Sequence, residues 1–547
     1  MHRRSETCPS GALFNLLDSL IHSDDALAGS LQENLDGTFI SYLCQRLRRK
    51  PKENTMTDTQ VPQSSPPIDG KPSVAPNKRL GQISLIACLG GLLFGYDTGV
   101  ANGAEGHMAQ ELGLTTLQLG VVISSLVFAA AFGALIAGRI SDAIGRRRTI
   151  ILLSLLFFAG ALLVVFSPSG PPGEFYGPGF GVLVAGRIML GLAVGGASTV
   201  VPVYLAELAP LEIRGSLSGR NELAIVLGQL LAFVINAIIA STLHGVVDGI
   251  WRIMFAVCAV PAVALFIGML RMPESPRWLV SHGRYDEARK VMQTIRNPER
   301  VNSELEDIMQ AHKANGGQAG RGMGLREVLS NKWLVRLVIV GIGVAVAQQL
   351  TGINAIMYYG TRVLEESGMN AEQAVIANIS FGVVAVIGGI VALRNMDRLD
   401  RRTTFILGLS LTTTFHILIA IAGSVLPVGN SMRPIVILVL VVGFVLSMQS
   451  FLNVAVWVWL AEIFPVQVKG IGCGISVFCG WAVNGVVALF FPTLVSGIGL
   501  TASFLIFAVV GALALIFIVK FVPETRGRSL EELDREIYSG RIFSRQS

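Results

Sequence analysis

Long apolar stretches alternate with short polar ones from about residue 82 to residue 521. The stretches are close to or above about 18 residues long, which is the length that an α-helix needs to cross a bilayer. The pattern predicts an all-α membrane protein with twelve transmembrane helices, divided six and six by a polar stretch at 272–333. The predicted helices lie at about 82–104, 118–141, 149–167, 180–207, 217–241, 251–271, 334–361, 373–394, 403–424, 435–461, 471–495 and 500–521.

Polar segments flank and divide these helices. Residues 1–79 are irregular, and from Met56 onward they are rich in Pro and Ser, which is typical of a disordered tail. Met56 is also a candidate for the native start. Residues 284–313 and 529–538 carry charged and apolar residues at helical spacing, so we expect amphipathic helices there, the second capped by Ser529. The expected domains are a cytoplasmic tail at 1–79, a six-helix half at 80–272, a linker at 273–333, a second half at 334–522 and a cytoplasmic tail at 523–547.

Composition agrees with a membrane protein. The chain is 52% hydrophobic and 15% charged, whereas soluble proteins are about 25% charged. The net charge of +6 lies in short loops, which indicates membrane topology rather than nucleic-acid binding. Loops 105–117, 168–179 and 242–250 contain no Lys or Arg, whereas the loops on the other side are basic. The positive-inside rule therefore predicts a multi-pass protein with both termini in the cytoplasm. We expect its location to be the plasma (inner) membrane. The six cysteines lack the spacing of a metal site, and we expect neither a metal nor a cofactor.

The second half of the chain repeats the charged motifs of the first. Asp142 and Asp397 are 255 positions apart (397 − 142), and so are Glu207 and Glu462 (462 − 207). Arg214 and Lys469 keep the same offset. The offsets predict two six-helix halves in parallel repeat, with a site between them.

The stretch 348–360, QQLTGINAIMYYG, is polar although it lies inside an apolar segment. Amide groups at membrane depth are costly unless they face a cavity or a partner. On a straight helix Gln349 and Asn354 point about 140° apart, so they line one cavity only if the helix breaks near Thr351 and Gly352. One interpretation is a broken helix beside a site for a neutral solute with many hydroxyls. The other is polar contact between packed helices.

Six motifs occur together in a fixed order, and they carry a family resemblance. The chain resembles the sugar porter family of the major facilitator superfamily over about residues 80–535. The motifs are GYDTGVANG, GRISDAIGRRR, the pair YLAELAPLEIRG and WLAEIFPVQVKG, PESPRWL at 273–279, QQLTGINAIMYY, and PETRGRSLEEL at 523–533. The resemblance implies the major facilitator fold, alternating access and transport of monosaccharides or polyols. GYDTGVANGA and NELAIVLGQL are most similar to bacterial inositol-type proton symporters.

Asp97 lies within the first predicted span. An isolated buried carboxylate has to pair or take up a proton, and Arg187 on the fourth span is the natural counter-charge. The resemblance favours a role in proton coupling, in which Asp97 stays ionised beside Arg187 and accepts a proton when moved away. A structural hydrogen-bonding role near the helix end is the alternative.

Glu222 lies about 12 Å along the fifth span from Arg214, well into the membrane. Many porters that resemble this stretch have a glutamine there. Glu222 is a candidate to bind substrate hydroxyls or to act as a second proton site, and a salt bridge to Arg220 or another base is the alternative. Gln229 is two turns further on and shares its face.

The resemblance also implies a set of substrate-lining residues, in which amides donate to and accept from hydroxyls and a tryptophan offers an apolar face. They are Gln229, Gln348, Gln349, Asn354, Tyr358, Asn378, Trp457 and Asn484. Tyr359 is expected to act in gating. Two positions depart from the family: Asn453-Val454 stand where Gly-Pro is frequent, and Gly480 stands where Gln or Asn is frequent.

The resemblance further implies a charged latch that holds the two halves together on the cytoplasmic side. Its members are Asp142, Arg146, Glu207, Arg214, Glu274, Arg277, Glu462 and Lys469. Ordinary positive-inside charge is the alternative. Asp400 replaces a usual glycine and Lys469 a usual arginine, so we expect the second-half latch to be weaker, because lysine lacks the bidentate fork of arginine.

These observations predict proton-coupled import of a small, neutral, polyhydroxylated substrate by a monomer in the bilayer, with myo-inositol favoured. The alternatives are a passive monosaccharide facilitator and a sugar receptor that does not transport. No nucleophile triad or metal cluster stands out, so we do not expect an enzyme. The residues leave open which sugar or polyol is carried and whether Glu222 adds a second proton.

Overall fold

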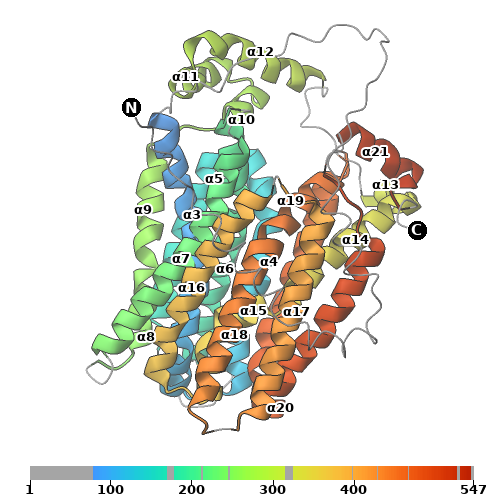
Figure 1. Cartoon of the computed structure of the whole chain (residues 1–547). Helices are drawn as coiled ribbons and strands as arrows, with labels where there is room; N and C mark the ends of the chain where they lie inside the picture. The colour runs from blue at the N-terminus through green and yellow to red at the C-terminus, as the bar shows by residue number, and fades with distance from the viewer. Residues whose placement is uncertain are drawn as a thin grey trace, which may run out of the picture. The chain divides into compact units, whose positions relative to one another are not determined.

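The computed structural model describes residues 78–168, 178–210, 214–243, 247–314, 325–396, 398–427, 429–465, 467–526 and 530–543. The predicted tail up to residue 77, Asp397 and Ser529 lie outside this described part, as does the side chain of Arg214. The described residues are predominantly helical and contain no β-strand. Figure 1 shows the long helices running roughly side by side, with the shorter ones α10 to α13 and α21 at one end of the bundle.

The first half contains the helices that the apolar pattern predicts. They are α3 (Lys78–Leu112), α4 (Thr116–Ile144), α5 (Arg146–Val165), α6 (Pro178–Leu208), α7 (Arg214–Leu243), α8 (Ile250–Val257) and α9 (Ala259–Leu270). The last two meet at Cys258 and form a single candidate span, Ile250–Leu270. This half therefore supplies six membrane-spanning units.

The second half has the same organisation. Its helices are α14 (Lys332–Gln349), α15 (Ile353–Glu366), α16 (Ala371–Asn395), α17 (Arg401–Val425), α18 (Met432–Met448), the π-helix η2 (Gln449–Asn453), α19 (Val454–Ile463) and α20 (Lys469–Phe521). In all, eleven helical stretches in the described part are long and apolar enough to cross a membrane. The last one, α20, has 53 residues and breaks at Gly499, where φ is +80°. The break separates the two final predicted spans, so the twelve-helix prediction is confirmed.

Four short helices lie in the part of the predicted linker that the structure describes. Residues 276–330 contain α10 (Pro276–Ser281), α11 (Tyr285–Ile295), α12 (Pro298–Ala314) and α13 (Leu325–Ser330). Apolar residues of α10, α11 and α12, among them Trp278 and Met292, bury one another in a small cluster separate from the main core. The chain ends in α21 (Leu530–Ser539) and η3 (Arg541–Phe543).

The predicted break within the seventh span is present. Helix α14 ends at Gln349 and α15 begins at Ile353, and Gly352 between them has φ +76°. A residue with a side chain is strained at such a φ value, which explains why glycine suits this position. Because the helix restarts on a new axis, residues before and after the break can face the same space.

The two halves contact each other through α3 with α15, α4 with α20, and α7 with α16. The approach of α4 to α20 is close enough to require glycine at one point. A Cβ added to Gly120 would lie 2.1 Å from the carbonyl oxygen of Leu489. Small residues allow backbones to approach in this way within membranes.

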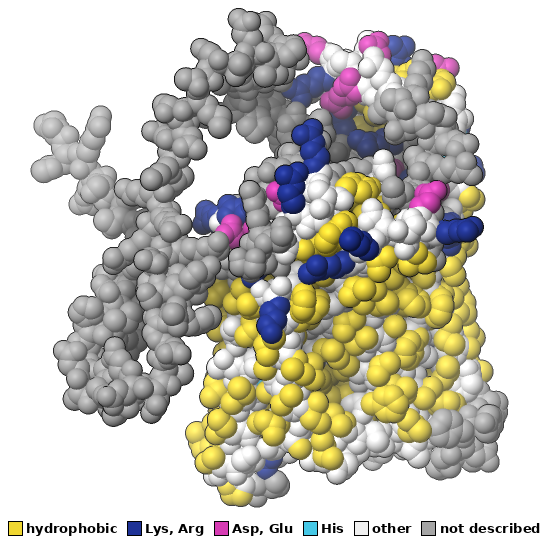
Figure 2. Space-filling model, turned by 90° about the vertical axis from the view of Figure 1, so that its right-hand side faces the viewer, with side chains coloured by type: hydrophobic (Ala, Val, Ile, Leu, Met, Phe, Trp, Pro, Cys, Tyr) yellow, Lys and Arg dark blue, Asp and Glu magenta, His cyan; other side chains and the backbone are white. Residues whose placement is uncertain are grey.

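The outer surface of the bundle is apolar. Figure 2 shows hydrophobic side chains over most of the visible face, with Lys and Arg gathered toward the end that carries the short helices. Large aliphatic residues such as Val260, Val439 and Leu513 are at least 60% exposed on the long helices. A surface of this kind suits lipid rather than water.

Candidate functional site

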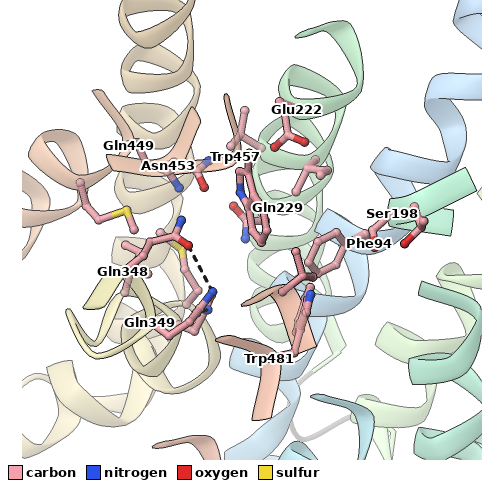
Figure 3. Close-up of a pocket in the computed structure, with 18 residues that line it drawn as sticks. Phe94, Ser198, Glu222, Gln229, Gln348, Gln349, Gln449, Asn453, Trp457 and Trp481 are labelled. Carbon is pink, nitrogen blue, oxygen red and sulfur yellow. Dashed lines mark hydrogen bonds between the residues drawn. The ribbon is translucent and has the colours of Figure 1, made fainter. Parts of the chain in front are cut away.

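A cavity of about 230 Å³ lies among residues from both halves. Figure 3 shows Glu222 and Gln229 projecting from α7 toward the space that Gln348 and Gln349 approach from α14. The lining residues are Phe94, Ser198, Thr199, Glu222, Ile225, Val226, Gln229, Gln348, Gln349, Ile353, Asn354, Met357, Met448, Gln449, Asn453, Trp457, Val477 and Trp481. Five of the eight predicted substrate-lining residues are among them: Gln229, Gln348, Gln349, Asn354 and Trp457.

The break between α14 and α15 brings the amides of this stretch together. The Gln349 amide nitrogen donates to the side-chain oxygen of Gln348 at 3.4 Å, and Asn354 donates to the side-chain oxygen of Gln349 at 2.7 Å. Gln348 and Gln349 are only 5% and 7% exposed. The three amides therefore form a connected polar strip on the cavity wall, which is the arrangement that the broken-helix interpretation requires.

Helix α7 supplies the facing wall. Glu222 and Gln229 both line the cavity, and the side-chain oxygen of Gln229 has no hydrogen-bond partner among the described residues. Among the described residues Glu222 forms no ion pair with a basic side chain, and Arg220 is exposed. The structure therefore does not support the salt-bridge alternative for Glu222.

The π-helix η2 adds two amides that the sequence reasoning did not select. Gln449 and Asn453 both line the cavity, followed by Trp457 on α19. A π-helix is rare and is frequent at functional sites, because it shifts the register of side chains along one face. The available signal was the pair of amides in QSFLN, inside an otherwise apolar segment.

Three predicted substrate-lining residues do not line this cavity. Asn378 donates to the hydroxyl of Thr361 at 2.7 Å and to the carbonyl of Ala374 at 3.0 Å. Tyr358 and Asn484 are 1% exposed and also lie outside the lining. Their contact with the solute stays a prediction.

Asn102 was missed by the sequence reasoning, and it ties α3 to α15 across the two halves. Its amide nitrogen donates to the carbonyls of Ile356 (3.2 Å) and Met357 (3.0 Å). Its side-chain oxygen accepts from the backbone N–H of Thr361 (2.8 Å) and from the Thr361 hydroxyl (2.9 Å). A Cβ at Gly360 would lie 2.5 Å from the Asn378 side-chain oxygen and 2.9 Å from the Asn102 amide nitrogen, so a larger residue would displace these amides. The signal was an amide within the first apolar span.

Tyr359, the predicted gating residue, is fully buried on α15. Its hydroxyl donates to the carbonyl of Ala488 on α20 at 2.7 Å. The backbone of α15 departs from helical geometry at this residue, with φ −127° and ψ 23°. The contact lies within the second half, and the gating role stays a prediction.

Asp97 and Arg187 form a buried ion pair between α3 and α6. The guanidinium lies 3.0 Å from the carboxylate, and both side chains are 1% exposed. Arg187 also donates to the carbonyl of Val122 at 3.3 Å. The predicted counter-charge is therefore in place, within the first half and outside the cavity lining.

Two charged networks with equivalent contacts, one in each half, lie at the helix ends beside the short helices. Arg146 contacts Asp142 (2.8 Å) and Glu207 (3.1 Å). Arg401, 255 positions after Arg146 (401 − 146), contacts Glu462 at 3.0 Å. The repeat that the sequence predicts is thus a repeat of contacts as well as of residues.

A glutamate caps a helix in each network. Glu274 accepts from the backbone N–H groups of Arg146 (2.9 Å) and Arg147 (3.1 Å), at the start of α5. Glu524 accepts from those of Arg401 (3.0 Å) and Arg402 (2.9 Å), at the start of α17. A carboxylate satisfies the unpaired first-turn N–H groups and complements the helix dipole.

The ion pairs of Arg146, Arg187 and Arg401 each join two residues of the same half. Arg277 and Lys469 are exposed, and the Arg214 side chain is outside the described part. Asp400, the departure from the family motif, lies 3.3 Å from Arg526. The latch between the halves, and its weaker second half, stay predictions.

Comparison with known proteins gives concordant matches. The profile of the family described as "Sugar (and other) transporter" matches residues 83–537. The putative metabolite transport protein YfiG of Bacillus subtilis (strain 168) is 44% identical over 88% of this chain and 96% of its own length. The major myo-inositol transporter IolT of the same strain is 44% identical, over 83% of this chain and 93% of its own. Among solved structures, the inward-open xylose transporter XylE from E. coli superposes with a TM-score of 0.71 and 29% identity, covering 83% of this chain and 99% of XylE. Another structure describes XylE as a proton:xylose symporter.

Proposed function

Because this chain belongs to the sugar transporter family, whose members are membrane transporters with the major facilitator fold rather than enzymes, we propose that it imports a sugar or cyclic polyol together with protons. Import proceeds by alternating access between the two six-helix halves. The observation that carries the proposal is the amide-lined cavity between the halves, formed where the seventh span breaks.

The substrate that we propose is myo-inositol. The cavity wall carries Gln229, Gln348, Gln349, Asn354 and Asn453, whose amides can each donate and accept. A cyclic polyol presents hydroxyls around its rim, which suits such a wall, and C–H faces above and below the ring, which suit the indole of Trp457. The similarity to the myo-inositol transporter IolT supports this choice.

Proton coupling rests on the buried pair of Asp97 and Arg187. Taking two charges out of water is costly, and the cost is offset only while the two charges remain paired. If α3 and α6 shift so that the pair separates, Asp97 is left as an isolated carboxylate, and a proton then stabilises it. Loading and release of that proton is the step that we propose to link to solute movement. Glu222, on the cavity wall, is the candidate for a second proton or for direct contact with hydroxyls.

The proposed location is the plasma (inner) membrane. The apolar surface faces lipid, and the basic end with the short helices lies in the cytoplasm together with both termini. In this orientation the networks of Arg146 and Arg401 lie at the cytoplasmic ends of the halves, where the proposed latch acts.

Uptake in proteoliposomes tests the proposal. The purified full-length chain is given labelled myo-inositol, glucose or xylose, with and without an inward proton gradient. Gradient-driven accumulation of myo-inositol is the expected result. Equilibration without accumulation contradicts coupling and makes the protein a passive facilitator. Binding without uptake of any of the three contradicts transport and makes it a receptor.

A further inference from the structure

The cavity wall has an uneven charge. Among the eighteen lining residues Glu222 is the one ionisable side chain, and the wall contains no Lys, Arg or His. A carboxylate that faces a cavity without a basic partner influences which ligands bind there. It favours groups that donate hydrogen bonds, and a positively charged donor above all, because charge-assisted hydrogen bonds are about twice as strong as neutral ones.

The surroundings of Glu222 suit a cation of moderate size. The aromatic rings of Phe94, Trp457 and Trp481 line the same cavity, with Phe94 and Trp481 5.5 Å apart between ring centroids. Aromatic faces attract ammonium groups electrostatically. The other polar groups of the wall are amides and hydroxyls, which bind sugar hydroxyls and impose no opposing charge.

We propose that the cavity accepts a polyol bearing one protonated amine, an amino sugar or an aminocyclitol, with the ammonium group at Glu222 and the remaining hydroxyls on the amide wall. This inference rests on the proposed function, because it names a substrate class for the same cavity. With a neutral polyol, Glu222 receives hydroxyl donors only. With an amino polyol, the ammonium brings the compensating charge into the cavity itself.

Binding measurements on matched pairs test the proposal. The intrinsic fluorescence of the tryptophans at the cavity reports binding to the full-length protein in detergent. Glucosamine is compared with glucose, and an inosamine with myo-inositol; N-acetylglucosamine controls for size without charge. We expect the amine to bind about tenfold more tightly than its neutral partner in at least one pair, with the preference lost when pH rises enough to deprotonate the amine.

Two variants test whether the preference for the amine depends on Glu222. Glu222→Gln keeps size and hydrogen bonding but removes the charge, so the ratio of amine affinity to neutral-polyol affinity should fall to about one, whatever the change in neutral-polyol affinity. Glu105→Gln is the matched control, because it removes another buried carboxylate, 3% exposed and outside the cavity lining, and should keep the preference. Retained binding of neutral polyols shows that Glu222→Gln is folded.

Equal or weaker binding of the amine in both pairs overturns the inference, as does a preference that survives in Glu222→Gln. The proposed function is tested by a separate result. It fails if proteoliposomes take up no polyol, whichever ligand binds more tightly in the binding assay.

Discussion

The Asp97 carboxylate lies 3.0 Å from the Arg187 guanidinium, yet neither residue lines the cavity in which we place the solute. The proton-binding candidate and the solute site are therefore separate. Coupling between them has to pass through movement of α3, which carries Asp97 and also contributes Phe94 to the cavity wall. Asn102, two turns after Phe94 on the same helix, ties α3 to the other half.

Asp97→Asn is expected to abolish accumulation and to spare exchange. The amide cannot take up a proton, but it can still hydrogen-bond to Arg187, so the fold is kept. In proteoliposomes with a proton gradient, uptake should stop at equal concentrations on both sides, while exchange of labelled for unlabelled solute continues. Glu105→Gln, on the same helix, should still accumulate solute. Full uphill uptake by Asp97→Asn would rule out this carboxylate as the coupling group.

Gln349→Ala and Asn378→Ala should differ, although the sequence places both in the substrate site. Gln349 lines the cavity and orients Asn354, so we expect its loss to weaken solute binding about tenfold, the effect of roughly 1.4 kcal/mol. Asn378 is engaged with Thr361 instead. Its loss should lower the melting temperature and change affinity less than about twofold. Titration of each variant with solute, followed by tryptophan fluorescence, measures the affinities, and a reversed order would move the site toward α16.

Asn102→Ala should destabilise the contact between the halves. It removes two donors and one acceptor from a buried cluster, at an expected cost of about 1–3 kcal/mol for each group left unpaired. Asn236→Ala is the matched control, since Asn236 is equally buried but donates to Gly99 and Val100 within the first half. Both variants should lower the melting temperature. Only Asn102→Ala should also change the rate of solute exchange, and equal exchange rates would argue against a junction role.

Glu274→Ala and Glu524→Ala should each lower stability by about 1 kcal/mol, because each removes the acceptor for first-turn N–H groups of a long helix. Similar losses are expected, because the two caps share one geometry. Thermal unfolding in detergent measures both, with the exposed Glu366→Ala as a control that should stay within about 0.5 kcal/mol. A loss of stability in only one of the two variants would show that the glutamate cap stabilises one half and not the other.

The sequence predicts the number and approximate positions of the membrane-spanning helices well. Apolar runs determine twelve spans, and Gly352 marks a place where one span breaks, because a backbone with positive φ favours glycine. Motif positions likewise identify five residues that line one cavity, four amides and Trp457. These properties depend on local chemistry or on spacing along the chain.

Other features depend on how helices meet. The π-helix that turns Gln449 toward the cavity has no distinct residue signature. Asn102 looks like any amide in a span until Thr361 is placed beside it. The motif match assigned Tyr358 and Asn378 to the substrate site. Whether they line the cavity depends on the non-helical backbone at Tyr359 and on the packing of α16. These are tertiary effects, and a single sequence does not record them.

Glu274 and Glu524 each follow the last long helix of a half and hold the start of its third helix. In each half, hydrogen bonds therefore join the segment after the last span to the start of the third span. A displacement of one of these helices is opposed by its bonds to the other. Bonds of this kind oppose changes within a half, so under the proposed alternating access we expect the contacts between the halves to change most. In the proposed cycle we therefore expect the rate of solute exchange to depend on junction contacts such as that of Asn102.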